Sequence, residues 1–174
     1  MSFETDISVI LENEGGKVDD PRDPGGRTNK GITNKVYRAW KNDPTADVWD
    51  ATDEEINAIY KQNYWDASNC SNIAEPLALV VFDTAVNCGV TRAKRILDTV
   101  LKVDDSNTLH ICMLYLDARS QFYNNLVHQK PNLSVFLRGW QNRVTKIRKL
   151  CLNYQPEPPS QQFFTMRNMA PPGP

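Results

Sequence analysis

Histidine and cysteine are scarce in this chain of 174 residues, which contains two histidines and four cysteines. The cysteines lie far apart and form no CxxC pair, so a zinc site of familiar spacing is not expected. His110 and Cys112 would also point to different faces of a helix. We therefore expect no metal, no cofactor and small buried thiols at Cys70, Cys88, Cys112 and Cys151.

Long apolar runs are also missing. The richest stretch, Leu77 to Phe82, is far shorter than the roughly 18 residues that a transmembrane helix needs. Near the N-terminus, Glu4, Asp6 and Glu12 interrupt the apolar positions, whereas a secretory signal would carry lysines and an apolar run. We expect no signal peptide and no transmembrane segment, and hence a soluble protein made in the cytoplasm.

The net charge of −1 conceals an uneven distribution along the chain. Residues 1 to 70 carry 8 basic and 14 acidic side chains, whereas residues 117 to 150 carry 7 basic side chains and 1 acidic one. A basic C-terminal third could attract an anionic polymer such as a cell wall, a nucleic acid or a lipid surface. A solvated helix face explains the same charges equally well.

The apolar periodicity predicts a mainly α fold with one small β-hairpin near the N-terminus. Residues 3 to 13 have the helical period, and Gly15 and Gly16 are expected to end this helix in the left-handed conformation. Turn signals between Lys17 and Thr33 predict a polar loop and the hairpin. The further helices expected are a short one after Thr33, one from the Thr52–Glu55 capping box to about Asn63, Leu77–Cys88 between Pro76 and Gly89, Arg92–Leu101 capped by Thr91, one from Ser106 to about His128, and one over 133–151.

The last of these helices has the clearest pattern. Its apolar stripe, which runs from Leu133 to Cys151, is expected to be core. The opposite face would carry, in part, Arg138, Arg143, Lys146, Arg148 and Lys149. We expect a single catalytic domain over residues 1–155, followed by an extended proline-rich tail over 156–174.

Candidate chemistry is concentrated in the segment from Glu14 to Thr33. Hydrolysis of a glycosidic bond needs a proton donor on one side of the sugar and a carboxylate or an activated water on the other. Glu14 fits the donor, because the negative end of a helix disfavours a charged carboxylate and should raise its pKa. It could equally be a surface residue before a helix stop. Asp19, Asp20 and Asp23 follow in the loop, where Asp23 could serve only the turn, and Thr28 could be a hairpin hydroxyl that bonds locally.

The motif E14-G-G followed by D20-P-R-D-P-G-G-R-T-N-K-G-I-T33 closely resembles the glycoside hydrolase family 108 lysozymes, which include phage endolysins. The segments Tyr64-Trp65, F82-D-T-A-V-N-C-G89 and Arg92-Ala93 are also similar to the family, and Leu137 to Val144 looks like the end of its predicted peptidoglycan-binding region. The resemblance covers about residues 3 to 152. This sequence departs from it at Lys17, where the family often has tyrosine; a lysine so close to Glu14 would oppose the helix effect.

The resemblance implies a lysozyme-like α+β fold in which the hairpin lines a cleft and residues 90–153 form a peptidoglycan-binding-like helical part. It maps the catalytic acid onto Glu14 and its partners onto Asp23 and Thr28. The spacing of the residues adds four substrate-binding candidates, each with a structural alternative. Asp83 and Asn87 share one helix face, although Asp83 could be a buried partner, and Tyr64 and Trp65 could stack on a sugar or belong to the core.

The implied activity is that of an endolysin, an N-acetylmuramidase that hydrolyses the β-1,4 bond between N-acetylmuramic acid and N-acetylglucosamine in bacterial peptidoglycan. Such an enzyme would accumulate in the host cytoplasm and would need a membrane-permeabilising partner such as a holin to act on the wall. The alternative is a non-catalytic peptidoglycan-binding module. A nucleic-acid partner is not expected, because the acidic N-terminal half would repel phosphates.

Overall fold

The computed structural model describes residues 3–12, 14–19, 26–103 and 107–155. This part of the chain is mainly α, as predicted, and contains seven α-helices and one two-stranded sheet. The α-helices are α1 (Phe3–Leu11), α2 (Asn34–Lys41), α3 (Asp53–Tyr60), α4 (Leu77–Cys88), α5 (Val90–Leu101), α6 (Thr108–Gln129) and α7 (Ser134–Leu152). The strands are β1 (Thr28–Asn29) and β2 (Ile32–Thr33), and the short helical turns are η1 (Val48–Asp50), η2 (Lys61–Asp66), η3 (Cys70–Asn72) and η4 (Pro131–Leu133).

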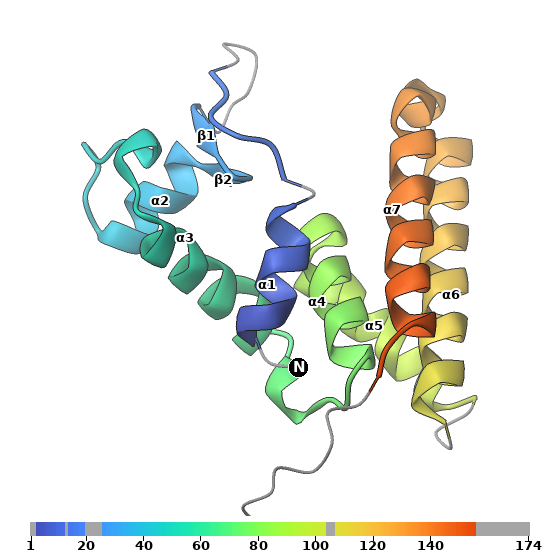
Figure 1. Ribbon diagram of the computed structural model, residues 1–174. Coiled ribbons are helices and arrows are strands. Elements are labelled where there is room, and N and C mark those ends of the chain that lie inside the picture. Colours follow the sequence, from blue (N-terminus) through green and yellow to red (C-terminus); the bar gives the residue numbers. More distant parts are fainter. Residues whose placement is uncertain (1–2, 13, 20–25, 104–106, 156–174) are drawn as a thin grey trace, which may run out of the picture.

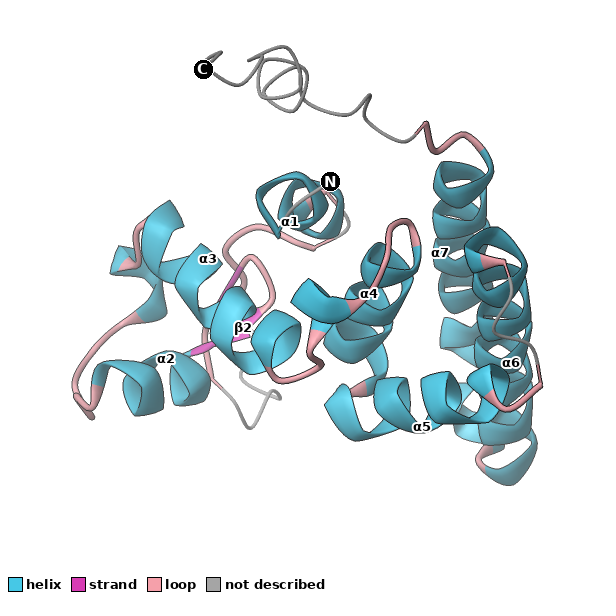
Figure 2. Ribbon diagram, turned by 90° about the horizontal axis from the view of Figure 1, so that it is seen from below, coloured by secondary structure: helices cyan, strands magenta, loops and turns pink. Residues whose placement is uncertain are grey.

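The helices form two groups on either side of α1 and α4 (Figure 1). The long helices α6 and α7 lie side by side on one side, and the hairpin, α2 and α3 lie on the other (Figures 1 and 2). Helix α4 is buried almost all around, because nine of its residues, Leu77 to Ala85, have little or no exposed surface. The described residues include no helix long and apolar enough to cross a membrane.

The predicted hairpin is confirmed. Its strands are antiparallel, with Thr28 opposite Thr33 and Asn29 opposite Ile32, so Lys30 and Gly31 form the turn. Val18 extends the ladder, since its backbone pairs with that of Thr28.

Side-chain caps fix the starts of several helices at the predicted residues. The Thr33 hydroxyl accepts a hydrogen bond from the Val36 amide at 3.2 Å, and Thr52 and Glu55 form a reciprocal capping box. One predicted cap was wrong, because Gly89, and not Thr91, precedes α5. The cap of α6 is Asn107, one residue after the predicted start at Ser106, and its side chain accepts from the His110 amide.

The structure corrects two further expectations. Gly15 and Gly16 do not adopt the left-handed conformation, because α1 already ends at Leu11. The apolar stripe of α7 is core only in its C-terminal half, where Val144, Ile147 and Cys151 are buried, whereas Phe136 is 54% exposed. Cys70, Cys112 and Cys151 are buried free thiols, as predicted, and Cys88 is half-buried. The predicted tail, 156–174, lies outside the described residues.

Asp6 on α1 is an acidic side chain with no exposed surface. Burial, and then the nearby charge of Glu75, raises the pKa of Asp6 from 3.8 to about 8. Between these two pH values the folded protein therefore holds a proton that the unfolded chain has released. The stability that this proton contributes is fully present below about pH 4 and is lost as the pH rises through about 8.

We predict that the free energy of unfolding of the wild type falls between pH 4 and 8, by an amount on the order of 5 kcal/mol at about 1.4 kcal/mol per pKa unit. Asp6→Asn cannot ionise, so its profile should be flatter and its stability at pH 9 higher than that of the wild type. Urea unfolding at several pH values measures both, and Asp98→Asn, on the exposed surface of α5, is the matched control. An Asp6→Asn profile parallel to that of the wild type would contradict the prediction.

Candidate functional site

Glu14 lies just beyond the C-terminal end of α1, close to the predicted position. Its backbone amide donates a hydrogen bond to the Leu11 carbonyl at 3.2 Å, so the chain makes one further turn after the helix. The side chain is 19% exposed and accepts a hydrogen bond on Oε1 from Nη1 of Arg143, on α7, at 2.9 Å. Two segments that lie 129 residues apart in sequence therefore meet at this carboxylate.

The hairpin turn packs directly against Glu14. Gly31 has a φ of +78°, and a Cβ atom there would lie 2.7 Å from the Tyr60 hydroxyl oxygen and 2.8 Å from Oε2 of Glu14. The Tyr60 hydroxyl holds the turn by donating to the Lys30 carbonyl at 2.8 Å. Only glycine fits between the turn and the carboxylate, for reasons of both backbone conformation and space.

Two tyrosines form the wall beside Glu14. The rings of Tyr60, at the end of α3, and Tyr64, in η2, have centroids 5.5 Å apart. Burial, and then the negative charge of Glu14, raises the pKa of both hydroxyl groups above their usual range. Both tyrosines therefore remain neutral near the carboxylate at physiological pH.

Arg143 joins Glu14 to a second carboxylate inside the protein. Its Nη1 contacts Glu14, and its Nε donates to Oδ1 of Asp83, on α4, at 2.9 Å. The arginine side chain is only 11% exposed. Burial by itself would lower the pKa of Arg143, but Asp83 and Glu14 outweigh it and raise the pKa, so this side chain is a fixed cation.

The network continues into the interior through Asp83. Its Oδ2 accepts from Nη1 of Arg119, on α6, at 2.5 Å, and neither side chain has any exposed surface. Arg119 also donates to the hydroxyls of Thr84 and Tyr123. The result is an alternating series of charges, Glu14, Arg143, Asp83 and Arg119, that links α1, α4, α6 and α7.

These contacts correct the interpretation of the basic C-terminal third. Arg143 was expected on the exposed face of the last helix, but it is half-buried and binds two carboxylates. Lys146 pairs with Glu12 at 3.1 Å, and Arg148 pairs with Asp117 at 2.6 Å. Much of the basic charge is therefore matched by acidic groups of the same chain.

The predicted partners of Glu14 are only partly described. Asp23 lies outside the described residues, and so does Asp20. Thr28 lies in β1, in the same hairpin as Gly31, and its hydroxyl donates to the Val18 carbonyl over a long distance of 3.5 Å. Lys17, where relatives often have tyrosine, is exposed.

The four binding candidates separate into two groups. Asn87 is exposed, and half-buried Tyr64 lies close enough to Glu14 to sense its charge. Asp83 and Trp65, by contrast, are buried, with 0% and 4% exposure. Direct contact of Asp83 with a substrate is therefore excluded in this structure, and the alternative of a buried partner describes it correctly.

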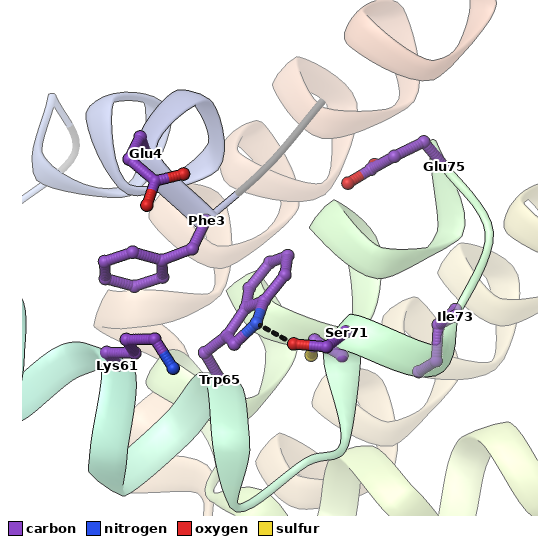
Figure 3. Close-up of a pocket in the computed structure, with 8 residues that line it drawn as sticks. Phe3, Glu4, Lys61, Trp65, Ser71, Ile73 and Glu75 are labelled. Carbon is purple, nitrogen blue, oxygen red and sulfur yellow. Dashed lines mark hydrogen bonds between the residues drawn. The ribbon is translucent and has the colours of Figure 1, made fainter. Parts of the chain in front are cut away.

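Trp65 belongs to the core and to a pocket away from Glu14. Its ring makes edge contacts with Phe3 and Phe82, and its Nε1 donates to the Ser71 hydroxyl at 2.8 Å (Figure 3). This pocket, of about 340 Å³, lies at the N-terminal end of α1, whereas Glu14 follows the other end of that helix. Of the two alternatives for Trp65, the structure therefore supports membership of the core.

A second pocket, of about 370 Å³, opens on the α7 side of Glu14, and Arg143 is one of its lining residues. Among the residues that the structure describes, no group of three or more histidine, cysteine, aspartate and glutamate side chains could hold a metal ion. The chemistry available at this site is that of a carboxylic acid, an arginine, hydroxyls and amides.

Comparison with known proteins agrees with this arrangement. Residues 7–89 match the family described as Glycosyl hydrolase 108. A solved structure, "Structure of Brucella abortus SagA", is 28% identical, with a TM-score of 0.72 over 86% of this chain and 93% of that chain. No curated protein gives a significant match. The structural likeness continues beyond the family match, which ends at Gly89. Over residues 7–89 this chain is similar to the glycosyl hydrolase 108 family, and its mainly α fold is lysozyme-like.

Proposed function

We propose that the protein is an endolysin-type lysozyme, an N-acetylmuramidase that hydrolyses the β-1,4 bond between N-acetylmuramic acid and N-acetylglucosamine in bacterial peptidoglycan. One observation carries the proposal. The glutamate of the family motif lies where the hairpin turn, the tyrosine wall and Arg143 meet, with one oxygen fixed by Arg143 and the other against Gly31. General acid catalysis needs a proton donor held in position, and these contacts fix the position of the Glu14 carboxyl group.

In this mechanism Glu14 is the general acid. Arg143 contacts Oε1, which leaves Oε2 as the oxygen that delivers a proton to the leaving sugar oxygen as the bond from C1 breaks. A water molecule supplies the hydroxyl group that C1 gains. Asp23 acts as the base that takes up the proton of this water, or as an electrostatic stabiliser of the positive charge, in which case the proton passes to the solvent. Thr28 orients the water.

The proposed biological role is lysis of a bacterial host. The enzyme would act on the wall after release from the cytoplasm, with a holin or a similar membrane-permeabilising protein as its partner. Residues 90–153 would form the peptidoglycan-binding-like part, and residues 1–155 a single catalytic domain. The family resemblance motivates these assignments, together with the position of α7 beside Glu14.

Replacement of Glu14 tests the catalytic role. Glu14→Gln keeps the size of the side chain but cannot supply an acidic proton, so cleavage of purified peptidoglycan should fall by about a thousandfold or more. Glu12→Gln is the matched control, because Glu12 is an exposed glutamate that also pairs with a basic residue of α7. It should cleave at close to the wild-type rate, and circular dichroism checks the fold of both variants.

Mass spectrometry of the digested wall identifies the bond. New reducing-end muramic acid is expected, whereas reducing-end glucosamine would indicate a glucosaminidase, and freed amino groups a peptidase. A wild-type protein that binds the wall and releases no fragment would be the non-catalytic binding module. Near-normal cleavage by folded Glu14→Gln would refute the role of Glu14.

The Thr28 hydroxyl is proposed to orient the attacking water, so its removal should slow catalysis. Thr28→Ala should lower the rate by roughly ten- to ten-thousand-fold, the range found for groups that position reactants. Thr28→Ser keeps the hydroxyl and should recover most of the activity. Equal rates for Thr28→Ala and the wild type would show that the hydroxyl has no catalytic role and only forms its local hydrogen bond to the Val18 carbonyl.

Gly31 offers a test of how closely the turn must fit Glu14. A methyl group at this position overlaps Oε2 of Glu14, so Gly31→Ala should lower kcat by at least tenfold in addition to destabilising the turn. Gly26→Ala is the matched control, because Gly26 also has a positive φ, of +74°. A Cβ atom at position 26 would lie 3.6 Å from the Cβ of Asn34, which is an ordinary contact distance. Both variants should lose about 1–2 kcal/mol of stability, from backbone strain, and only Gly31→Ala should lose activity. Equal activity of the two variants would show that contact with Glu14 is unimportant.

A further inference from the structure

The pocket on the α7 side of Glu14 is built from one face of α7 and the C-terminal end of α4. Its volume is about 370 Å³, and its lining residues are Asn87, Gly139, Trp140, Asn142, Arg143 and Lys146. Positions 139, 142, 143 and 146 are spaced by three, one and three residues, so they share one helix face. The pocket thus combines two cations, two amides, an aromatic ring and a bare stretch of helix.

Arg143 connects this pocket to the catalytic carboxylate. Two of its nitrogens bind Glu14 and Asp83, whereas Nη2 is buried and has no hydrogen-bond partner among the described residues. A buried guanidinium donor without an acceptor is costly unless a ligand supplies one. Lys146, paired with Glu12, adds positive charge one turn further along α7.

Nothing in the part of the chain that the structure describes requires a glycine at position 139. It lies inside α7, where glycine is less stable than alanine, and its φ is not positive. A Cβ built at this position meets no atom within 4 Å, so no neighbouring side chain requires its absence. The space that a side chain would fill belongs to the pocket, and glycine lets a ligand approach the helix backbone closely.

The other walls of the pocket are held rigidly by Tyr123. The Tyr123 ring stacks on Trp140, with centroids 5.0 Å apart and an interplanar angle of 20°, and its hydroxyl donates to Oδ1 of Asn87. Among the described residues the amide nitrogen of Asn87 has no hydrogen-bond partner, so it is available as a donor at the pocket. An indole ring and an amide in fixed positions suit a sugar ring with an N-acetyl group.

We propose that this pocket is the subsite for the muramic acid unit of the glycan, in which Arg143 and Lys146 bind a carboxylate carried by that sugar. This inference rests on the proposed function. It specifies, in addition, that the acidic sugar lies on the α7 side of Glu14. The carboxylate is either that of the lactyl group or one of the stem peptide attached to it. N-acetylglucosamine carries neither group, so the pocket distinguishes the two alternating sugars of the wall by charge.

Binding of disaccharides tests the subsite without any need for cleavage. The probes are N-acetylglucosaminyl-N-acetylmuramic acid, the same disaccharide with its stem peptide, and the uncharged N,N′-diacetylchitobiose, titrated by calorimetry at low and high salt. The wild type should bind a muramic disaccharide at least tenfold more tightly than chitobiose, and high salt should weaken only the muramic complexes. Tighter binding of the peptide-bearing form assigns the carboxylate to the stem peptide. Weaker binding of that form assigns it to the lactyl group, whose carboxylate is lost in the amide bond to the peptide.

Substitutions at Gly139 then locate the binding. Gly139→Gln fills the pocket and should weaken muramic binding by tenfold or more, whereas Gly139→Ala, the matched control, should change it by less than about threefold. Neither should lower the midpoint of thermal unfolding, because the Cβ position is open. Lys146→Gln should weaken the binding of the charged probes and leave that of chitobiose unchanged.

Unchanged muramic binding by Gly139→Gln would overturn the proposal, and so would equal binding of chitobiose or no measurable binding of any probe by the wild type. Its failure is distinguishable from failure of the proposed function. If the protein binds muramic disaccharides at this pocket and cleaves no wall, the subsite is supported and the hydrolase activity is refuted. If it cleaves the wall and Gly139→Gln does not change muramic binding, the hydrolase activity is supported and the subsite is refuted.

Discussion

The ion pair between Glu14 and Arg143 is the contact on which the site depends. It joins the end of the first helix to the last helix and is anchored from behind by Asp83 and Arg119, which are completely buried. Such a network is costly to dehydrate and stable only when complete, and removal of one partner from a buried pair typically costs about 3–5 kcal/mol. The arrangement therefore contributes more to the position of the Glu14 carboxylate than to the stability of the fold.

The same network explains the uneven charge of the chain. The acidic N-terminal part and the basic C-terminal third meet through Glu12, Glu14 and α7, so opposite charges that are distant in sequence neutralise each other inside one molecule. An external anionic polymer is not needed to account for the basic residues. What remains for a ligand is local: Nη2 of Arg143, which has no hydrogen-bond partner among the described residues, and the charge of Lys146 beside it.

The sequence predicts those features that short segments determine. The caps at Thr33 and at Thr52 with Glu55, the stop at Gly89 and the hairpin follow from residues three or four positions apart, and the Glu14 motif is local too. Arg143 was missed as a partner of Glu14 because 129 residues separate them and no periodicity encodes such a contact. One signal was present: Arg143 lies beside Val144 and Trp140, on the border of the apolar stripe, where a charged side chain needs a partner.

The burial of Asp83 and Trp65 could not be predicted from the sequence, for a related reason. Asp83 belongs to a run of apolar residues on α4, and only the arrival of Arg119 and Arg143 from two other helices makes its burial favourable. Trp65 follows Tyr64 directly in η2, yet the ring of Trp65 lies in the core and that of Tyr64 lies near Glu14. Neighbouring residues of similar chemistry thus acquire different roles through tertiary packing.

Two glycines on opposite sides of Glu14 show how the backbone itself shapes the site. Gly31 is required by contact, because any side chain there would occupy the place of the carboxylate and the Tyr60 hydroxyl. Gly139 stands in open space, and no described residue requires a glycine at this position. The first glycine fixes the acid, and the second keeps a surface of α7 bare next to the arginine that holds that acid. A polymer laid across α7 would therefore reach Glu14 from the side of its counter-charge, Arg143, while the hairpin turn supports the carboxylate from the opposite side.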